Sequence, residues 1–172
     1  MHIRVGCFVV VCLLAASAWA QGENVAGRLK LEVHKMLDAT IGGDYETLVK
    51  MTHPKAIEAM GGPDKAMALL KLSLDSLKAS GFVTKLQEVG TPTVINSQTS
   101  SFAVVPYTVI ITGGGNKITS KTAVVGFSSD AGKTWKFLNV TEKGEEGMRQ
   151  LMPDLPEDLK FPKIEQKVEE VK

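Results

Sequence analysis

The hydrophobic residues in the first half of the chain recur at the three- to four-residue spacing of a helix with one apolar face. Residues 25–41 follow this pattern, which stops at Gly42 and Gly43. Asp44 then stands at an N-cap position, before a shorter helix over residues 45–51. The pattern therefore predicts two successive helices, each with one side directed at a core.

Two further helices are predicted before the middle of the chain. Residues 55–60 can add one or two helical turns, and Pro63 begins a longer helix that runs to about Ser80. Gly81 ends this helix, because glycine adopts the left-handed conformation of a C-cap without strain. Its apolar stripe predicts four buried side chains, which are Met67, Leu70, Leu74 and Leu77.

After Gly81 the period of the apolar residues changes from 3.6 to 2, which indicates strands. Residues 82–95 are predicted to form one strand that bends at Gly90 and Pro92. Residues 101–112 carry apolar side chains on both faces, so both faces of the sheet must be covered. Two more strands are predicted, one before and one after a loop at 129–132, over residues 117–128 and 133–140.

After the strands, residues 145–152 are predicted to form a short helix that ends before Pro153. From Lys163 the charges alternate and apolar residues are few, which predicts a frayed or disordered tail over 163–172. Helices followed by antiparallel strands predict an α+β fold, in which N-terminal helices pack on a strongly bent antiparallel sheet and a short C-terminal helix follows. A single domain over residues 23–162 accounts for the pattern.

The first twenty residues have the pattern of a secretory signal peptide. Arg4 precedes an apolar run of about twelve residues, and Ala18 and Ala20 are the small residues that signal peptidase requires. The run is shorter than the roughly 20 residues of a membrane-spanning helix. We therefore expect export to the periplasm or the extracellular space, with cleavage after Ala20 and no membrane insertion.

Composition and charge argue against several classes of function. The 172 residues carry 20 Lys and Arg against 19 Asp and Glu, and no basic patch suggests nucleic-acid binding. Cys7 and Cys12 both lie in the segment expected to be removed, which leaves no thiolate for catalysis or metal binding. The remaining histidines, His34 and His53, are far apart in sequence. No metal site and no cofactor are predicted.

Residues 128–135 have the spacing of an Asp box, a structural hairpin motif of β-proteins. Asp130 is placed to accept backbone N–H groups within the loop, and Gly132 can adopt a positive φ. We interpret the motif as structural, with the Trp135 ring buried under the turn. The five positions that define this Asp-box-like hairpin are Ser128, Asp130, Gly132, Thr134 and Trp135.

The order of the elements and three segments carry a family resemblance. Residues 44–49 place a short helix after a small acidic turn, and the other two segments are 52–54 and 128–135. Together they resemble the nuclear-transport-factor-2-like superfamily, also called cystatin-like or SnoaL-type, and its exported bacterial members in particular. The resemblance implies a cone-like roll with an internal pocket. It does not select one function, because the superfamily contains isomerases, cyclases, dehydratases and ligand-binding modules.

A ligand site, if present, is expected between the helices and the concave face of the sheet, with Tyr45, His53 and Tyr107 as its polar contacts. Phenols and imidazoles can lie at the wall of an apolar cavity and direct their polar tips at a ligand. Tyr107 follows Pro106, whose missing N–H indicates a sheet edge or a bulge. His53 has an alternative role as the cap of a turn.

These observations favour an exported, non-catalytic module that binds an apolar small molecule or a protein partner. No catalytic residue is assigned, because the strands are rich in Val, Ile and Thr and poor in acids. Two alternatives stay open. One is a small-molecule isomerase, cyclase or dehydratase of the ketosteroid-isomerase type, which needs a base near a donor in an enclosed cavity. The other is an accessory domain that forms a homodimer through its outer sheet face.

We predict that the exported protein begins at Gln21, because signal peptidase cleaves after the small residue at position −1, here Ala20. Mass spectrometry of protein recovered from the native cell envelope or medium should give a chain without residues 1–20. Retention of Met1, or a lipid on Cys12, would contradict this prediction.

Overall fold

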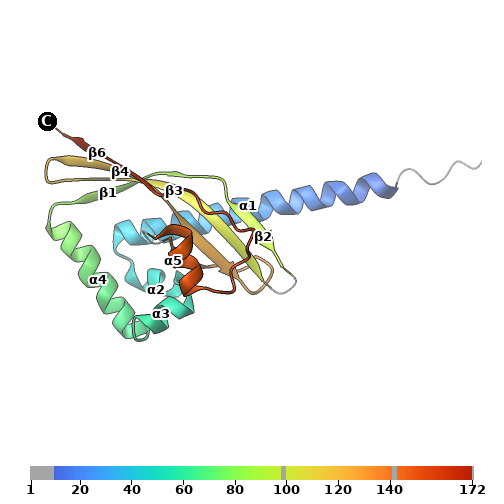
Figure 1. The fold of residues 1–172 in the computed structure, drawn as a ribbon, viewed down its shortest axis with the longest axis horizontal. Helices are drawn as coiled ribbons and strands as arrows, with labels where there is room; N and C mark the ends of the chain where they lie inside the picture. Colours follow the sequence, from blue (N-terminus) through green and yellow to red (C-terminus); the bar gives the residue numbers. More distant parts are fainter. Residues whose placement is uncertain (1–9, 98–99, 141–142, 172) are drawn as a thin grey trace, which may run out of the picture.

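The structure is a computed structural model that describes residues 10–97, 100–140 and 143–171 (Figure 1). Four helices come first, and five strands, a short helix and a sixth strand follow. This arrangement confirms the predicted α+β fold. Residues 1–9 of the expected signal peptide lie outside the described residues. Within the described part of the chain, no helix is both long and apolar enough to cross a membrane.

The first helix, α1 (Val10–Gly42), begins earlier than the predicted start at Val25. The apolar run before Ala20 is rich in Ala and Leu, which favour helix, and the N-terminal part of α1 extends away from the other elements (Figure 1). The C-terminal part crosses the sheet. Its buried side chains are Leu29, Val33, Met36, Leu37 and Ala39.

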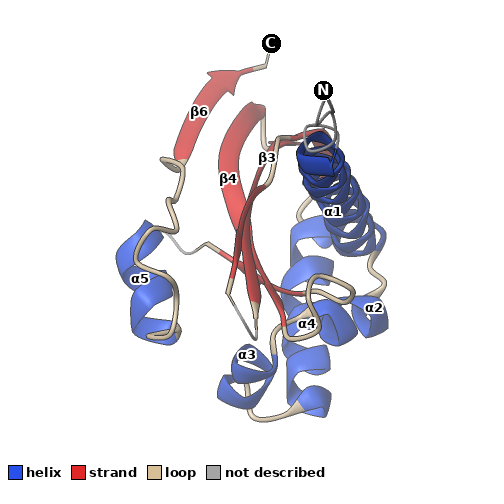
Figure 2. Cartoon of the chain, turned by 90° about the vertical axis from the view of Figure 1, so that its right-hand side faces the viewer, coloured by secondary structure: helices blue, strands red, loops and turns tan. Residues whose placement is uncertain are grey.

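Three shorter helices follow, of which the first and third join α1 in a helical layer on one face of the sheet and the second lies past the end of the strands (Figure 2). They are α2 (Tyr45–Met51), α3 (Pro54–Ala59) and α4 (Pro63–Ala79). The Asp44 carboxylate caps α2 by accepting the Thr47 N–H at 3.1 Å. Leu48 and Met51 are buried, as the apolar pattern of α2 predicts.

The outermost helix of this layer, α4, is more exposed than its sequence predicts. Of its residues only Ala66 is buried, and Leu70 and Leu74 are half-buried against the core of the sheet. The prediction that Leu77 is buried is wrong, because its side chain is 50% exposed. The reason is that α4 packs on α2 and α3 at the rim of the layer, where too few neighbouring side chains are available to cover all of its apolar residues.

All strand pairs in the sheet are antiparallel, and a long central hairpin organises them. The first edge is one bent strand interrupted at residues 90–92, as predicted, and its two parts both pair with β3. Gly114 and Gly115 form the central turn with φ of +57° and +76°, values typical of a type I′ hairpin. The strands are β1 (Val83–Val89), β2 (Thr93–Asn96), β3 (Ser101–Gly113), β4 (Asn116–Ser128), β5 (Lys136–Asn139) and β6 (Glu165–Glu170).

Apolar side chains cover both faces of the β3–β4 hairpin near the end that joins β5. On one face, Val105 and Val124 pack under α1 and α2, in a cluster that we call the inner core. On the opposite face, Val104 and Val125 belong to a second cluster, the outer core. The expectation that both faces of residues 101–112 are covered is therefore met in this half of the hairpin.

The outer core is closed by the C-terminal part of the chain. The helix α5 (Gly144–Leu151) and the segment after it bury Met148, Met152, Leu155 and Leu159 there. The Arg149 guanidinium holds this segment in place by donating hydrogen bonds to the backbone carbonyls of Leu155, Pro156, Glu157 and Leu159. This half of the outer sheet face is thus covered by the chain itself, and a second copy cannot pack on it.

The prediction of a frayed or disordered tail from Lys163 has to be corrected. Residues 165–170 form β6 and pair with β4. Two ion pairs match this pairing: Lys121 lies 3.5 Å from Glu165, and Lys117 lies 3.9 Å from Glu169. The strand has no fully buried side chain, so its sequence carries no hydrophobic signal. Backbone hydrogen bonds to β4 are what define it.

We predict that Trp135→Ala lowers the free energy of unfolding by about 3–5 kcal/mol. The Trp135 ring is 5% exposed, and its Nε1–H donates to the Gly132 carbonyl at 3.1 Å. Urea denaturation measures the change. As a control, Leu31→Ala removes a side chain that is 69% exposed and should change stability by less than about 0.5 kcal/mol. A loss under about 1 kcal/mol for Trp135→Ala would show that the ring does not anchor the hairpin.

Candidate functional site

Tyr45 lies at the start of α2, where its side chain connects α2 to α4. Its hydroxyl donates a hydrogen bond to the Asp75 carboxylate, and its ring packs against the inner core. This bond to the Asp75 carboxylate raises the pKa of Tyr45, so the phenol is protonated near neutral pH. Glycine suits position 43 because its φ is +81°, and a β-carbon there would lie 3.0 Å from Lys78 Nζ and 3.2 Å from the Tyr45 hydroxyl oxygen.

Tyr107 lies on the inner face of β3, and its hydroxyl donates to Asn139 Oδ1 on β5 at 3.2 Å. Burial raises the pKa of Tyr107 to about 12, so this phenol is also a protonated donor. The preceding Pro106 lies opposite the interruption between β1 and β2, and its carbonyl accepts the Gly90 N–H at 2.8 Å. The missing N–H of Pro106 therefore faces Gly90, just beyond the end of β1, and removes no hydrogen bond from a residue within β1 or β2.

His53 caps α3, which is the alternative role that its place before Pro54 suggested. Its Nδ1 accepts the Lys55 N–H at 3.2 Å, and its own backbone N–H donates to the Phe137 carbonyl at 2.9 Å. The imidazole packs on the Phe127 ring, with ring centroids 4.5 Å apart. Burial lowers the pKa of His53, so the ring is neutral at pH 7.

The three residues do not converge on one cavity. Tyr45 and Tyr107 both pack against the inner core, whereas the His53 ring contacts Phe127 of the outer core. The inner side of the sheet is occupied by core side chains such as Met36 and Leu48. The two phenol hydroxyls and the His53 Nδ1 each have a hydrogen-bond partner within the protein. The geometry therefore assigns each residue a structural contact.

Asn139, an exposed residue at the end of β5, is the partner of Tyr107 that the sequence reasoning missed. It shares a face of β5 with Phe137, because side chains two residues apart point to the same side of a strand. The signal that could have identified Asn139 is its place two residues after Phe137, on the same side of the strand. Its partner Tyr107 lies 32 residues earlier, so the pairing depends on the register of three strands.

The Asp-box-like hairpin is held by a compact set of hydrogen bonds. Asp130 Oδ1 accepts the backbone N–H groups of Lys133 and Thr134, at 3.1 and 2.9 Å, and the Ser128 hydroxyl at 2.7 Å. Its Oδ2 accepts the Thr134 hydroxyl. The Thr134 and Ser128 bonds hold the pKa of Asp130 well below its usual range. With its carboxylate fully engaged by the loop, Asp130 is a structural residue.

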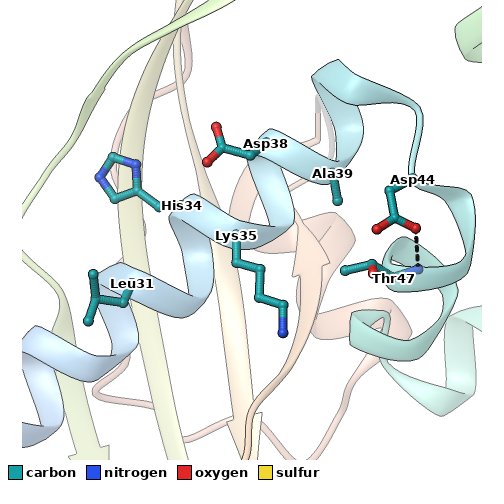
Figure 3. Close-up of a pocket in the computed structure, with 7 residues that line it drawn as sticks. All are labelled: Leu31, His34, Lys35, Asp38, Ala39, Asp44 and Thr47. Carbon is teal, nitrogen blue, oxygen red and sulfur yellow. Dashed lines mark hydrogen bonds between the residues drawn. The ribbon is translucent and has the colours of Figure 1, made fainter.

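A first hollow lies on the outside of the helical layer, between α1 and the start of α2 (Figure 3). It has a volume of about 540 Å³ and is open to solvent. Charged groups of both signs surround it, and Leu31 and Ala39 supply apolar surface. The residues that line it are Leu31, His34, Lys35, Asp38, Ala39, Asp44 and Thr47.

A second hollow lies on the outward side of α4 and is almost entirely apolar. Its volume is about 470 Å³, and Leu72 in its wall is 67% exposed. Asp75, which accepts the Tyr45 hydroxyl, lines this hollow, while Asp44, the residue before Tyr45, lines the first. The Tyr45–Asp75 contact therefore joins α4, which carries the second hollow, to α2, which begins beside the first. We call the outward sides of α1 and α4 that carry these two hollows the helical-layer surface.

The ionisable residues do not suggest a metal centre. Among residues that the structure describes, no three His, Cys, Asp or Glu side chains gather closely enough to hold a metal ion. His34 and Asp38 lie one turn apart on the exposed side of α1, beside the first hollow (Figure 3). Neither hollow contains Tyr107 or His53.

Comparison with known proteins finds a match among solved structures and none elsewhere. No protein-family model matches the chain, and no curated protein matches it. Among solved structures, the chain is similar to an NTF2-like protein with a cystatin-like fold from Novosphingobium aromaticivorans. The two are 16% identical, the match covers 85% of this chain and 99% of that chain, and the TM-score is 0.49.

We predict that the fold loses stability as the pH rises from 10 to 12, because Tyr107 ionises more readily when unfolded. Its folded pKa of about 12 lies above the ordinary value of 10.0, so the stabilisation is complete below pH 10 and disappears as the pH passes 12. The shift corresponds to about 2–3 kcal/mol in the free energy of unfolding. Urea denaturation at both pH values measures it, and Tyr107→Phe should lack this component.

A spectroscopic titration provides the control. The chain has 2 tyrosines, so Tyr45→Phe leaves Tyr107 as the sole phenol. Phenolate absorbance of this variant should then give a pKa of about 12. A titration midpoint near 10 would show that Tyr107 is accessible to water and would contradict the prediction.

Proposed function

We propose that this chain is an exported, non-catalytic binding module, and that its partner is a protein that docks on the helical-layer surface. The observation that supports this most directly is the exposure of large apolar side chains next to the two hollows. Leu31 and Leu72 are 69% and 67% exposed, and Leu69 on α4 is also exposed. Single exposed leucines are ordinary, but several beside open hollows in one helical layer are typical of a recognition surface.

The shape of the hollows favours a protein over a small molecule. A pocket for a small apolar ligand encloses most of the ligand surface, and both hollows are open to solvent. Protein interfaces combine an apolar centre with a polar rim. Here Leu72 and Ala68 would lie at the centre, with Lys71 and Asp75 beside them.

The positions of the phenols are the reason to favour binding over catalysis. An isomerase or cyclase needs a titratable base within hydrogen-bond reach of the reacting group, next to a donor in an enclosed cavity. Tyr107 donates to an amide oxygen, and the His53 Nδ1 is used as a helix cap. The Tyr45 hydroxyl donates to Asp75 at the rim of the layer. None of these contacts leaves a base and a donor facing a shared space.

Native mass spectrometry tests the proposal on protein recovered without denaturation from its native compartment. We expect the wild-type chain to retain a protein partner and Leu72→Glu to lose it, because the substitution places a charge in the apolar centre of the surface. Val83→Glu is the matched control, since Val83 is a similarly exposed apolar residue that lies on β1 and outside both hollows. This control should retain the partner.

The other outcomes count against the proposal. A small molecule retained by wild type and by Leu72→Glu alike would favour the ligand-binding alternative. A chain that carries neither protein nor ligand, or equal loss of the partner in Leu72→Glu and Val83→Glu, would exclude the helical-layer surface as the docking site.

A further inference from the structure

The outer edge of β6 is open, because β6 pairs only with β4 among the strands of the described residues. In Figure 2 the strand lies at the periphery of the sheet, away from the helical layer. Proteins usually protect such edges with charged residues, and β6 has the sequence Glu-Gln-Lys-Val-Glu-Glu. Whether this edge repels or accepts another strand depends on which side chains would face each other.

Backbone groups on alternate residues of β6 point toward the open edge. The Val171 N–H donates to the Gly115 carbonyl at 2.8 Å, next to the last pair of the ladder. Hydrogen-bonded and non-hydrogen-bonded pairs alternate along an antiparallel ladder. The odd-numbered residues of β6 therefore bond to β4, and the N–H and C=O groups of Gln166, Val168 and Glu170 point outward.

These outward groups match one another in a single arrangement. If two copies of β6 lie antiparallel with Val168 opposite Val168, then Gln166 lies opposite Glu170 in both directions. All three outward-facing residues of each strand are then paired with outward-facing residues of the other. Shifts by one residue are excluded, because they would oppose outward-facing groups with groups already bonded to β4.

Charge selects this arrangement over its neighbours. Within one chain Lys167 already lies 2.9 Å from Glu169. With Val168 at the centre, Lys167 of each copy also lies opposite Glu169 of the other, which adds two attractive pairs across the edge. The next permitted shifts place Lys167 opposite Lys167, or Glu169 opposite Glu169, and like charges directly opposite each other are destabilising. A larger shift, with Gln166 opposite Gln166, also places Glu165 opposite Lys167, but it pairs only three residues of each strand. The register centred on Val168 pairs five residues of each strand and keeps both charge pairs attractive.

A row of apolar side chains across the sheet also ends at Val168, the centre of this arrangement. Ile111, Ile118 and Val168 are directly opposite one another on β3, β4 and β6. The two isoleucines are half-buried, whereas Val168, at the end of the row, is 61% exposed. A second copy in the arrangement above would place its own Val168 next to this side chain and continue the row across the edge.

We propose that two copies of this chain associate through antiparallel pairing of their β6 strands, centred on Val168, to form one continuous sheet. The contact is isologous, as in most homodimers. A six-residue strand pair buries less area than the roughly 1,200 Å² of a stable interface, so the dimer is weak and depends on concentration. This surface lies outside both hollows, and the inference does not rest on the proposed function.

Cysteine cross-linking tests the register. In the full chain with Cys7→Ser and Cys12→Ser, Val168→Cys places two thiols at directly opposite positions, with Cα atoms about 5.5 Å apart. Oxidised glutathione should then give a covalent dimer on non-reducing electrophoresis. Gln166→Cys is the control, because its two copies would lie four residues apart along the strands, about 13 Å, which is too far for a disulfide. Equal cross-linking of both variants, or of neither, would overturn the proposal.

Charge reversal tests the association itself. Sedimentation velocity over a range of concentrations should give a dimer dissociation constant that rises about tenfold in Lys167→Glu, because both attractive pairs become repulsive. The double variant Lys167→Glu, Glu169→Lys restores opposite charges across the edge and should recover most of the association. High salt should weaken the wild-type dimer, since these pairs are exposed.

Circular dichroism of each variant verifies that the fold is kept. An unchanged dissociation constant in folded Lys167→Glu, or no recovery in the folded double variant, would refute the edge contact. The Leu72→Glu variant should dimerise as wild type does, so loss of a partner at the helical-layer surface and loss of the β6 contact are distinguishable.

Discussion

The apolar character of both faces of the β3–β4 hairpin is the constraint on which the rest of the structure depends. Val105 and Val124 point to one side, and Val104 and Val125 to the other, and all four are almost fully buried. A sheet with two apolar faces needs two covers. The chain supplies α1 and α2 for the first face and residues 144–159 for the second, so its C-terminal part belongs to the core.

This double cover also determines where other molecules can bind. The inner core fills the space under α1 and α2 with leucine, methionine and aromatic side chains, and the outer core is closed by α5 and the segment that Arg149 holds. The surfaces that remain are the outward sides of the helices and the open edge of the sheet. The proposed docking of a protein partner and the proposed pairing of two copies both use these surfaces.

The candidate residues show how far local pattern can predict a site. The Asp-box-like hairpin was predictable because all its hydrogen bonds lie within eight residues, from Ser128 to Trp135. Capping of α2 by Asp44 was predictable for the same reason. The Tyr107–Asn139 and Tyr45–Asp75 contacts join residues 32 and 30 positions apart, and no local rule pairs them. The His53 ring packs on Phe127 of the outer core, a contact between residues far apart in sequence that no local pattern predicts.

The sequence by itself determined helices α2 to α5, strands β1 to β5 and the alternation of faces along β3, since each follows from hydrophobic period and from ending residues such as Gly43 and Gly81. Only the tertiary structure decided that α4 lies at the rim with Leu77 exposed, and that residues 165–170 form a strand. The reason is the same in both cases. An apolar stripe predicts burial only when a neighbour is available, and a polar strand such as β6 exists only because the edge of β4 is there to receive its backbone.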